Sequence, residues 1–318
     1  GVPISSYRIK LEEGSFNNIT RFILFRPKAR NYDNEIFAAT LFKKLGFLSP
    51  KTFKINVKIN NVSSNYIFQE NLKKEFLEDN NRVDGPILEA NEDLTRFNKL
   101  ALARISNKEW IQGKIENYII SLNAMKYYNF HRYANFGFRI KSINFKNSKG
   151  LAIDEVIRFD KKNLKLYEYK NIGTFQAIMF ALEGMHGLSY DDSRFYFNPL
   201  NNMIEPIYYD GDVGILSTIN YDKVLGKYNS KLENWKKTKD INSDFIDFEK
   251  KSFRYNLKNQ VVTSLARDNA LRAAEKLKKL ESSNFLLELK KNGFIDINQN
   301  QLNTLIKIIN DRLLIISQ

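Results

Sequence analysis

The chain has 318 residues, of which 43% are hydrophobic and 27% charged, and its formal net charge is +14. This length supplies a sizeable core and permits one large or two moderate domains. Cysteine is absent, which excludes disulfides and thiol catalysis, and the 2 histidines are too few for a histidine-based zinc site. No uninterrupted apolar run reaches the roughly 18 residues that a membrane span needs, so no span is expected.

The positive charge is dispersed, because the 50 Lys and Arg residues are spread along the chain rather than gathered into one tract. A basic chain can meet nucleic acid, anionic surfaces or acidic protein substrates, whereas dispersed lysines are also typical of an ordinary solvated surface. Since no basic motif with interleaved aromatic residues stands out, nucleic acid is not an expected partner. The absence of a starting Met and of a signal-peptide pattern suggests a piece of a longer protein whose targeting segment is missing.

The first part of the chain is predicted to contain strands and one helix. Residues 6–11 and 21–26 have strand-like alternation of polar and apolar side chains. A helix is predicted to begin near Asp33 and to end before Gly46, which suits a left-handed C-terminal cap. Further strands are predicted at 53–59, 65–70 and 86–90, with Asn60-Asn61 as a turn.

The rest of the chain is predicted to be mainly helical. Apolar residues at helical spacing predict helices over 95–130 and 171–186. Strands at 194–198 and 204–210 flank Asn201-Asn202, a pattern typical of a β-hairpin. Other predicted elements are strands at 137–143, 151–159 and 164–169 and a helical region from residue 245 to the end.

This order of elements predicts an α+β fold. A small mixed part, residues 1–92, is followed by a larger, mainly helical part, residues 93–318, and no linker separates them as independent domains. The C-terminal region carries a stripe of apolar residues at helical spacing, which is expected to be a packing face rather than a partner site. The stripe consists of Leu302, Leu305, Ile306, Ile309, Leu313 and Ile316.

The predicted hairpin joins two acidic segments. Asp191 and Asp192 precede its first strand, while Asp210 and Asp212 follow its second, so the hairpin is expected to bring the two pairs together. Carboxylate oxygens gathered in this way suit Mg²⁺ or Mn²⁺, with Asp192, Asp210 and Asp212 as the candidate ligands. The alternative is that both segments are ordinary Asp-rich turns. His186, at the predicted helix end, is either a packing histidine or a catalytic base.

A basic segment ends the predicted strand at 21–26. It includes Arg26 and Lys28 and stands just before the helix that carries Glu35. Phosphate binding requires a fixed cation beside a strand, oriented by an acid, and a pair of Lys28 with Glu35 fits that requirement. Alternatively, Glu35 only complements the helix dipole. Glu70 ends the last strand of the small part, where a nucleotide-binding hinge is expected.

Seven segments, taken together in this order and spacing, carry a family resemblance. They are Phe25-Arg26-Pro27-Lys28, Leu45-Gly46-Phe47-Leu48-Ser49-Pro50, Val57-Lys58-Ile59-Asn60, Tyr66-Ile67-Phe68-Gln69-Glu70, His186 to Asp192, Arg194-Phe195-Tyr196-Phe197-Asn198-Pro199 and Glu205-Pro206-Ile207-Tyr208-Tyr209-Asp210-Gly211. Over about two hundred residues, from Tyr7 to Leu216, the chain resembles the spore coat protein H (CotH) kinase-like family.

The resemblance implies a two-lobed atypical protein kinase fold that binds ATP and a divalent metal ion and modifies proteins. Lys28 matches the lysine that contacts the phosphates, with Arg26 beside it. Asp192 stands where many members carry a metal-binding Asn, and Asp210 matches the metal-binding Asp of the second loop. The family setting also makes a bacterial cell-surface or secreted location one expectation, although the compartment stays open.

The chain departs from the family pattern at two positions. The catalytic Asp expected in the first loop is replaced by His186 or Gly187. Asp192, in place of Asn, adds a negative charge to the metal site, which is expected to favour the metal and to weaken ATP binding.

The leading hypothesis is phosphoryl transfer from Mg-ATP to Ser or Thr of a protein that is acidic or rich in Ser and Thr. In it, Lys28 holds the phosphates, Asp192 and Asp210 hold the metal, and Asp191 or His186 orients the acceptor hydroxyl. A second hypothesis uses the same ATP site for adenylylation or protein glutamylation, since fold does not fix function. A third is a pseudokinase or structural surface-assembly module without catalysis.

Overall fold

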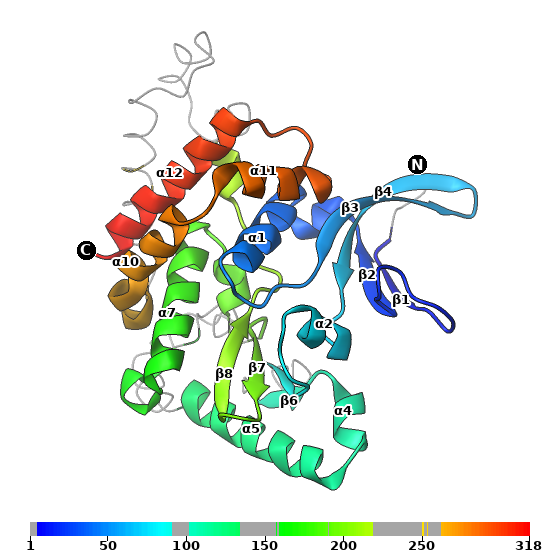
Figure 1. The fold of residues 1–318 in the computed structure, drawn as a ribbon, viewed down its shortest axis with the longest axis vertical. Coiled ribbons are helices and arrows are strands. Elements are labelled where there is room, and N and C mark those ends of the chain that lie inside the picture. Colours follow the sequence, from blue (N-terminus) through cyan, green and yellow to red (C-terminus); the bar gives the residue numbers. More distant parts are fainter. Residues whose placement is uncertain are drawn as a thin grey trace, which may run out of the picture.

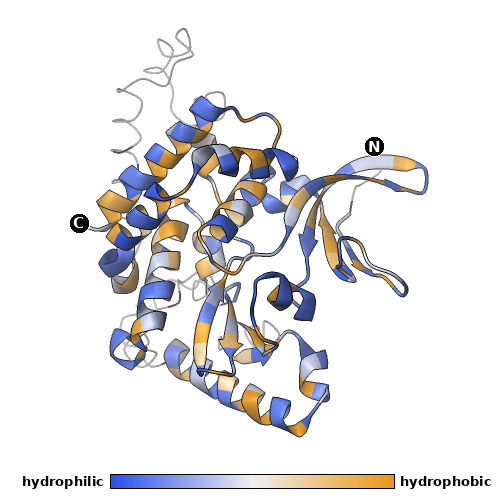
Figure 2. Cartoon of the chain, in the orientation of Figure 1, coloured by the Kyte–Doolittle hydropathy of each residue, from blue (hydrophilic) through white to orange (hydrophobic). Residues whose placement is uncertain are grey.

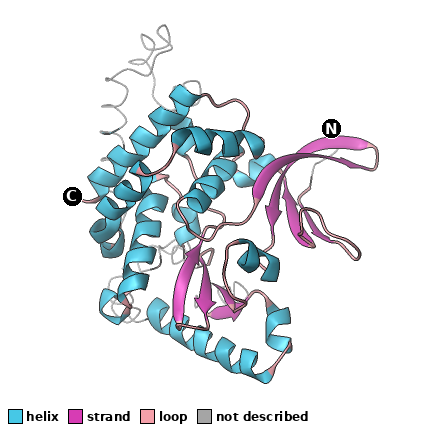
Figure 3. Cartoon of the chain, viewed as in Figure 1, coloured by secondary structure: helices cyan, strands magenta, loops and turns pink. Residues whose placement is uncertain are grey.

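The computed structural model describes residues 5–90, 102–133, 157, 159–189, 191–218, 250, 253 and 262–318. The α+β class is confirmed, because two antiparallel sheets of four strands each are combined with helices (Figure 3). The predicted strand at 137–143, nearly all of that at 151–159 and most of the region 245–261 lie outside the described residues.

The first sheet is built by the N-terminal part of the chain. Its strands are β1 (Tyr7–Lys10), β2 (Arg21–Phe25), β3 (Thr52–Ile59) and β4 (Val62–Glu70), in the order β1-β2-β4-β3. Asn60 and Asn61 both have positive φ angles, as the tight hairpin between β3 and β4 requires. One face of the sheet is aromatic, with Phe22, Phe53 and Phe68 in ring contact, and the other face meets the first helix.

Helix α1 (Asp33–Lys44) follows the short 3-10 helix η1 (Pro27–Arg30). The prediction of this helix is confirmed, and Gly46 takes a φ of +79° just beyond it. The helix lies between the first sheet and the C-terminal helices (Figure 1). Its apolar residues are therefore buried from two sides and join the largest core cluster.

The second sheet joins segments that are far apart in the sequence. Its strands are β5 (Ile87–Ala90), β6 (Ala103–Ile105), β7 (Arg194–Asn198) and β8 (Met203–Ile207), in the order β6-β5-β7-β8. The predicted hairpin is confirmed as β7–β8, and Asn202 at its turn has a positive φ. A backbone bond from the Tyr208 N–H to the Leu48 carbonyl, 2.8 Å long, ties the end of this hairpin to the chain that enters β3.

The continuous helix predicted over 95–130 is wrong. Strand β6 occupies part of that range because residues 103–105 pair with β5, and two helices follow, α4 (Lys108–Gln112) and α5 (Ile115–Tyr133). Asn107 sits at the change from strand to helix, where its side chain bonds the Ile87 N–H and the Gly85 carbonyl. Another short helix, α2 (Lys74–Asp79), was not predicted.

The strand predicted at 164–169 is also wrong, because a helix begins there. The 3-10 helix η2 (Lys161–Asn163) leads into α7 (Leu166–Ala181). The buried carboxylate of Glu168 accepts the Lys165 N–H at 3.0 Å, which caps the first turn of the helix, and also the Ile204 N–H at 2.8 Å. The helix ends at Ala181 rather than near 186, and His186 lies in the next 3-10 helix, η3 (Met185–Leu188).

The C-terminal part packs three helices against α1 and α7. They are α10 (Ser264–Lys278), α11 (Ser282–Lys291) and α12 (Gln299–Ile316). Apolar and polar residues alternate along α12 (Figure 2), and the predicted stripe is confirmed as a packing face, with Ile306 partly buried and its other members buried. Within the described part of the chain, no helix combines the length and the apolar character needed to cross a membrane.

Candidate functional site

The β7–β8 hairpin brings the two acidic loops together. Asp192 lies just before β7, and Asp210 lies shortly after β8. With His186 of η3 they form a cluster in which each residue offers one ligand atom, and these atoms all lie within 4.8 Å of one another. The His186 Nε2 is 3.4 Å from the Asp192 Oδ2. Asp212 is exposed and does not belong to this cluster.

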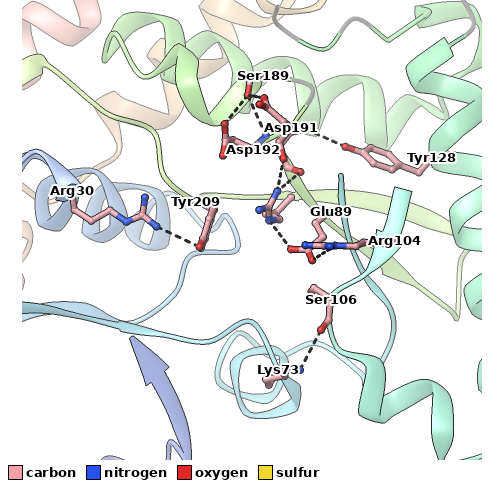
Figure 4. Close-up of polar contacts among 12 residues, drawn as sticks. Arg30, Lys73, Glu89, Arg104, Ser106, Tyr128, Ser189, Asp191, Asp192 and Tyr209 are labelled. Atoms are coloured by element: carbon pink, nitrogen blue, oxygen red, sulfur yellow. Dashed lines mark hydrogen bonds and ion pairs between the residues drawn. The ribbon is translucent and has the colours of Figure 1, made fainter. Parts of the chain in front are cut away.

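The first acidic loop is organised by a buried serine (Figure 4). The Ser189 Oγ lies 2.6 Å from the Asp191 Oδ1 and 3.1 Å from the Asp192 Oδ2, and it accepts the Asp192 N–H at 3.2 Å. Burial raises the pKa of Asp192; the charge of His186 lowers it, and that of Asp191 raises it further. The net effect is a raised pKa, so the surroundings of Asp192 disfavour its charged form.

The second acidic loop faces a buried arginine. Asp210, whose φ is +44°, forms an ion pair with Arg30 of η1, and the Arg30 side chain is only 6% exposed. The Arg30 guanidinium lies 3.9 Å from the centre of the Phe25 ring and donates to the Tyr209 hydroxyl at 3.4 Å. A left-handed backbone conformation at a non-glycine residue is typical of turns and functional sites.

Glu35 is buried in the core and interacts electrostatically with the same arginine. Its carboxylate accepts hydrogen bonds from the Gln69 amide at 2.9 Å and the Tyr208 hydroxyl at 2.7 Å. Burial raises the pKa of Glu35 to about 7, and the charge of Arg30 acts in the opposite direction. Arg30, rather than Lys28, is therefore the cation whose charge acts on Glu35, and the Lys28 side chain is exposed. The sequence shows a run of cations here but not which one turns inward.

Neither of the other two predicted nucleotide contacts belongs to the acidic cluster. Glu70 is 2% exposed and accepts the Lys51 N–H at 3.0 Å; burial raises its pKa to about 7. Arg26 is exposed, and its backbone N–H donates to Ser6. The residues that follow Glu70, rather than Glu70 itself, line the cleft described next.

A cleft of about 370 Å³ lies between the two sheets. Lining residues come from strands β1 and β2, from the segment after β4, and from the second sheet with the two acidic loops. Its lining residues are Arg8, Ile23, Asn71, Leu72, Lys73, Glu89, Arg104, Ser106, Asp192, Arg194, Tyr209 and Asp210. The cleft thus combines basic side chains with both carboxylates of the cluster.

A network of charged residues on the second sheet supports this cleft (Figure 4). The Glu89 carboxylate contacts the Nε of Arg104 at 2.8 Å and the Nε of Arg194 at 3.2 Å. Arg194 also donates to the Asp191 carbonyl at 2.9 Å and lies 5.0 Å from the centre of the Tyr209 ring. Sequence reasoning missed these residues because their partners come from three separate segments.

The donor set fits a divalent cation such as Mg²⁺ or Mn²⁺. Asp192 and Asp210 supply the carboxylate oxygens that these ions prefer, and the open cleft leaves room for water or phosphate oxygens to complete the coordination. An imidazole is a softer ligand than a carboxylate and suits zinc better than manganese. His186 is therefore assigned as a neighbour of the metal subsite and not as a required ligand.

Among known proteins, no family model matches the chain and no curated sequence shows significant similarity to it. The resemblance to CotH kinase-like proteins therefore depends on the short motifs alone.

Proposed function

We propose that this chain is an ATP- and metal-dependent protein-modifying enzyme with a two-lobed, kinase-like organisation, which transfers phosphate to Ser or Thr of a protein. The observation that carries the proposal is the cleft between the sheets, because Asp192, Asp210 and the segment 71–73 all line it. An acidic pair facing a polar cleft of this size suits the metal and phosphates of a nucleotide.

The arrangement of Arg30 supports the phosphate side of the proposal. Its buried guanidinium pairs with Asp210 and its charge also acts on Glu35, and an arginine keeps its charge at every physiological pH. Guanidinium groups bind phosphate oxygens through paired hydrogen bonds, so Arg30 can serve the role that the resemblance assigns to a lysine.

The acceptor hydroxyl would be oriented by the first acidic loop. Asp191 is held by Ser189, and His186 lies beside Asp192 with its side chain 41% exposed. A bound Mg²⁺ would supply charge neutralisation on the phosphates. Catalysis of this kind consists mostly of positioning and charge stabilisation, so the loss of a strong base need not abolish it.

One observation favours the alternative in which the same ATP site serves adenylylation or glutamylation. Any side chain at Gly187 would collide with the Tyr209 carbonyl, because an added Cβ would lie 2.7 Å from that oxygen. An Asp is therefore sterically excluded at 187, which leaves His186 as the only residue at the expected position of the catalytic Asp. Without that Asp, a different use of the ATP site is a specific second candidate.

Ligand-induced stabilisation and intact-mass measurement together test the proposal. ATP with Mn²⁺ should raise the unfolding temperature of the parent more than either alone, since a ligand stabilises the state that binds it. Asp210→Asn should abolish this synergy, and Asp212→Asn, an exposed acid outside the cluster, should retain it. After incubation with ATP and protein acceptors, the mass added identifies phosphate, AMP or an amino acid. A parent chain with no synergy at millimolar ATP would refute the proposal and favour a non-catalytic module.

A further inference from the structure

Glu89 of β5 holds two arginines beside the acidic cluster. Its side chain is 16% exposed and lines the cleft, and its two carboxylate oxygens contact different guanidinium groups, those of Arg104 and Arg194 (Figure 4). Together, one carboxylate and two guanidinium groups carry a net positive charge. Removing the Glu89 charge would raise that positive charge and would take from both guanidinium groups a partner that they share in a partly buried site.

Arg194 is the cation that matters most for the candidate metal ligands. It stands two residues from Asp192 and lines the same cleft. Its guanidinium is fixed by the Glu89 carboxylate, the Asp191 carbonyl and the Tyr209 ring, and its side chain is only 7% exposed.

The pair of Arg30 with Asp210 shows that a guanidinium in this region does bind a carboxylate of the cluster. A charge-assisted bond from arginine to carboxylate is among the strongest hydrogen bonds in proteins. A second arginine released near Asp192 would therefore compete with a metal ion for that carboxylate, and its charge would also repel the ion.

We propose that Glu89 is a positioning residue of the metal subsite, whose carboxylate binds Arg194 and Arg104 so that Asp192 stays available to a divalent cation. This inference rests on the proposed function, because it assumes that Asp192 and Asp210 bind the metal. It assigns to Glu89 no contact with the metal itself, and its effect is exerted through charge and through the position of Arg194.

Mn²⁺ binding, followed by electron paramagnetic resonance, tests the inference in the full chain. Glu89→Gln keeps the side-chain shape and removes the charge, so it should weaken Mn²⁺ binding on the order of tenfold while the protein stays folded. The matched control is Glu205→Gln on β8, which removes the same charge from a pair with Arg82 that does not line the cleft. This control should bind Mn²⁺ as the parent does.

A rescue variant separates charge from simple damage. Adding Arg104→Gln to Glu89→Gln restores the net charge of the network and should recover most of the lost Mn²⁺ affinity, whereas a merely structural defect would not be recovered. Unchanged affinity in Glu89→Gln, equal weakening by Glu205→Gln or a failed rescue would each overturn the inference.

The two proposals fail in different ways. If the parent chain binds no Mn²⁺, the metal site of the proposed function is wrong, and the inference falls with it. If the parent binds Mn²⁺ through Asp210 but Glu89→Gln binds it equally well, only the inference about Glu89 is wrong. If Glu89→Gln does not fold, the single variant Arg104→Gln tests the inference instead. Removing that cation should tighten Mn²⁺ binding about threefold. An unchanged affinity would contradict the inference.

Discussion

At the scale of single residues, the site depends on which side chains the fold turns inward. Arg30 and Lys28 are two positions apart in the same 3-10 helix, yet Arg30 is buried and Lys28 is exposed. A 3-10 helix has about three residues per turn, so positions two apart point in different directions. The ion pair with Asp210 and the contact with the Phe25 ring then stabilise the buried guanidinium.

Replacing each of these two cations by methionine should separate their roles. Arg30→Met leaves Asp210 without its partner and should lower the free energy of unfolding by about 3 kcal/mol, because breaking a buried ion pair from one side is costly. Lys28→Met changes an exposed side chain and should change the free energy of unfolding by less than about 0.5 kcal/mol. Urea unfolding of the two variants measures both values, and a larger loss for Lys28→Met would contradict the assignment.

Glu70 gives the protein a pH dependence of stability. Burial raises its pKa from the ordinary 4.5 to about 7 in the folded state, so the folded protein retains a proton that the unfolded chain releases. Its contribution is therefore fully present below pH 4.5 and is lost as the pH rises through about 7. Glu70→Gln cannot ionise. The difference in free energy of unfolding, variant minus parent, should therefore be larger at pH 8 than at pH 5, by on the order of 1–3 kcal/mol. Thermal unfolding at both pH values checks this, and a pH-independent difference would refute it.

At the scale of elements, two contacts with α1 fix the loop after Asp210. The Asn31 side chain, just before the helix, donates to the Val213 carbonyl at 2.7 Å, and the Asn34 side chain accepts the Leu216 N–H at 2.9 Å. The position of α1 and the conformation of the second acidic loop are therefore coupled. The same helix carries Glu35, whose carboxylate interacts electrostatically with Arg30.

The close packing of α7 on α10 depends on a glycine. A Cβ at Gly173 would lie 2.6 Å from the Leu265 carbonyl and would also collide with the Asn269 side chain. Gly173→Ala should therefore destabilise the protein by about 2 kcal/mol, because backbone and buried amide have no room to move away. Gly113→Ala is the control, because the nearest atoms to an added Cβ at residue 113 lie at 3.6 Å. The free energy of unfolding of this variant should stay within about 0.5 kcal/mol of the parent value. Differential scanning calorimetry measures both, and equal stability of the two variants would show that the helices can separate.

At the scale of the whole molecule, the N-terminal and C-terminal parts share one core. The largest hydrophobic cluster combines α1 residues such as Phe37 and Phe42 with residues of α7, α10, α11 and α12. The Phe42 ring contacts Phe175 at 4.7 Å and stacks on Tyr208 at 4.9 Å between ring centres. Residues 1–92 alone would expose this face of α1 to water.

The shared core predicts that the full chain unfolds in one transition and that a fragment of residues 1–92 does not fold alone. The fragment would lose the apolar burial that stabilises α1, at about 25 cal/mol for each Å² exposed. Calorimetry of the full chain and amide NMR of the fragment test this pair of expectations. Well-dispersed amide signals from the isolated fragment would show that the two parts are independent.

Several elements were determined by local sequence alone. The turn at Asn60-Asn61, the cap at Gly46 and the β7–β8 hairpin follow from residues that tolerate positive φ at fixed places between periodic segments. The hairpin then explains why Asp192 and Asp210 meet, since two loops that flank one hairpin must lie at the same end. These features depend only on the backbone within a few residues.

Other features were decided by the tertiary structure. The start of α7, misjudged as a strand, depends on Glu168 also accepting a bond from the distant Ile204. Likewise, residues 103–105 form strand β6 because they pair with the backbone of β5. Arg30 rather than Lys28 is buried because it forms an ion pair with Asp210, which lies 180 residues later in the sequence. Contacts between distant segments have no signature in local periodicity, so the fold had to be known before the cleft, its arginines and Glu89 could be recognised.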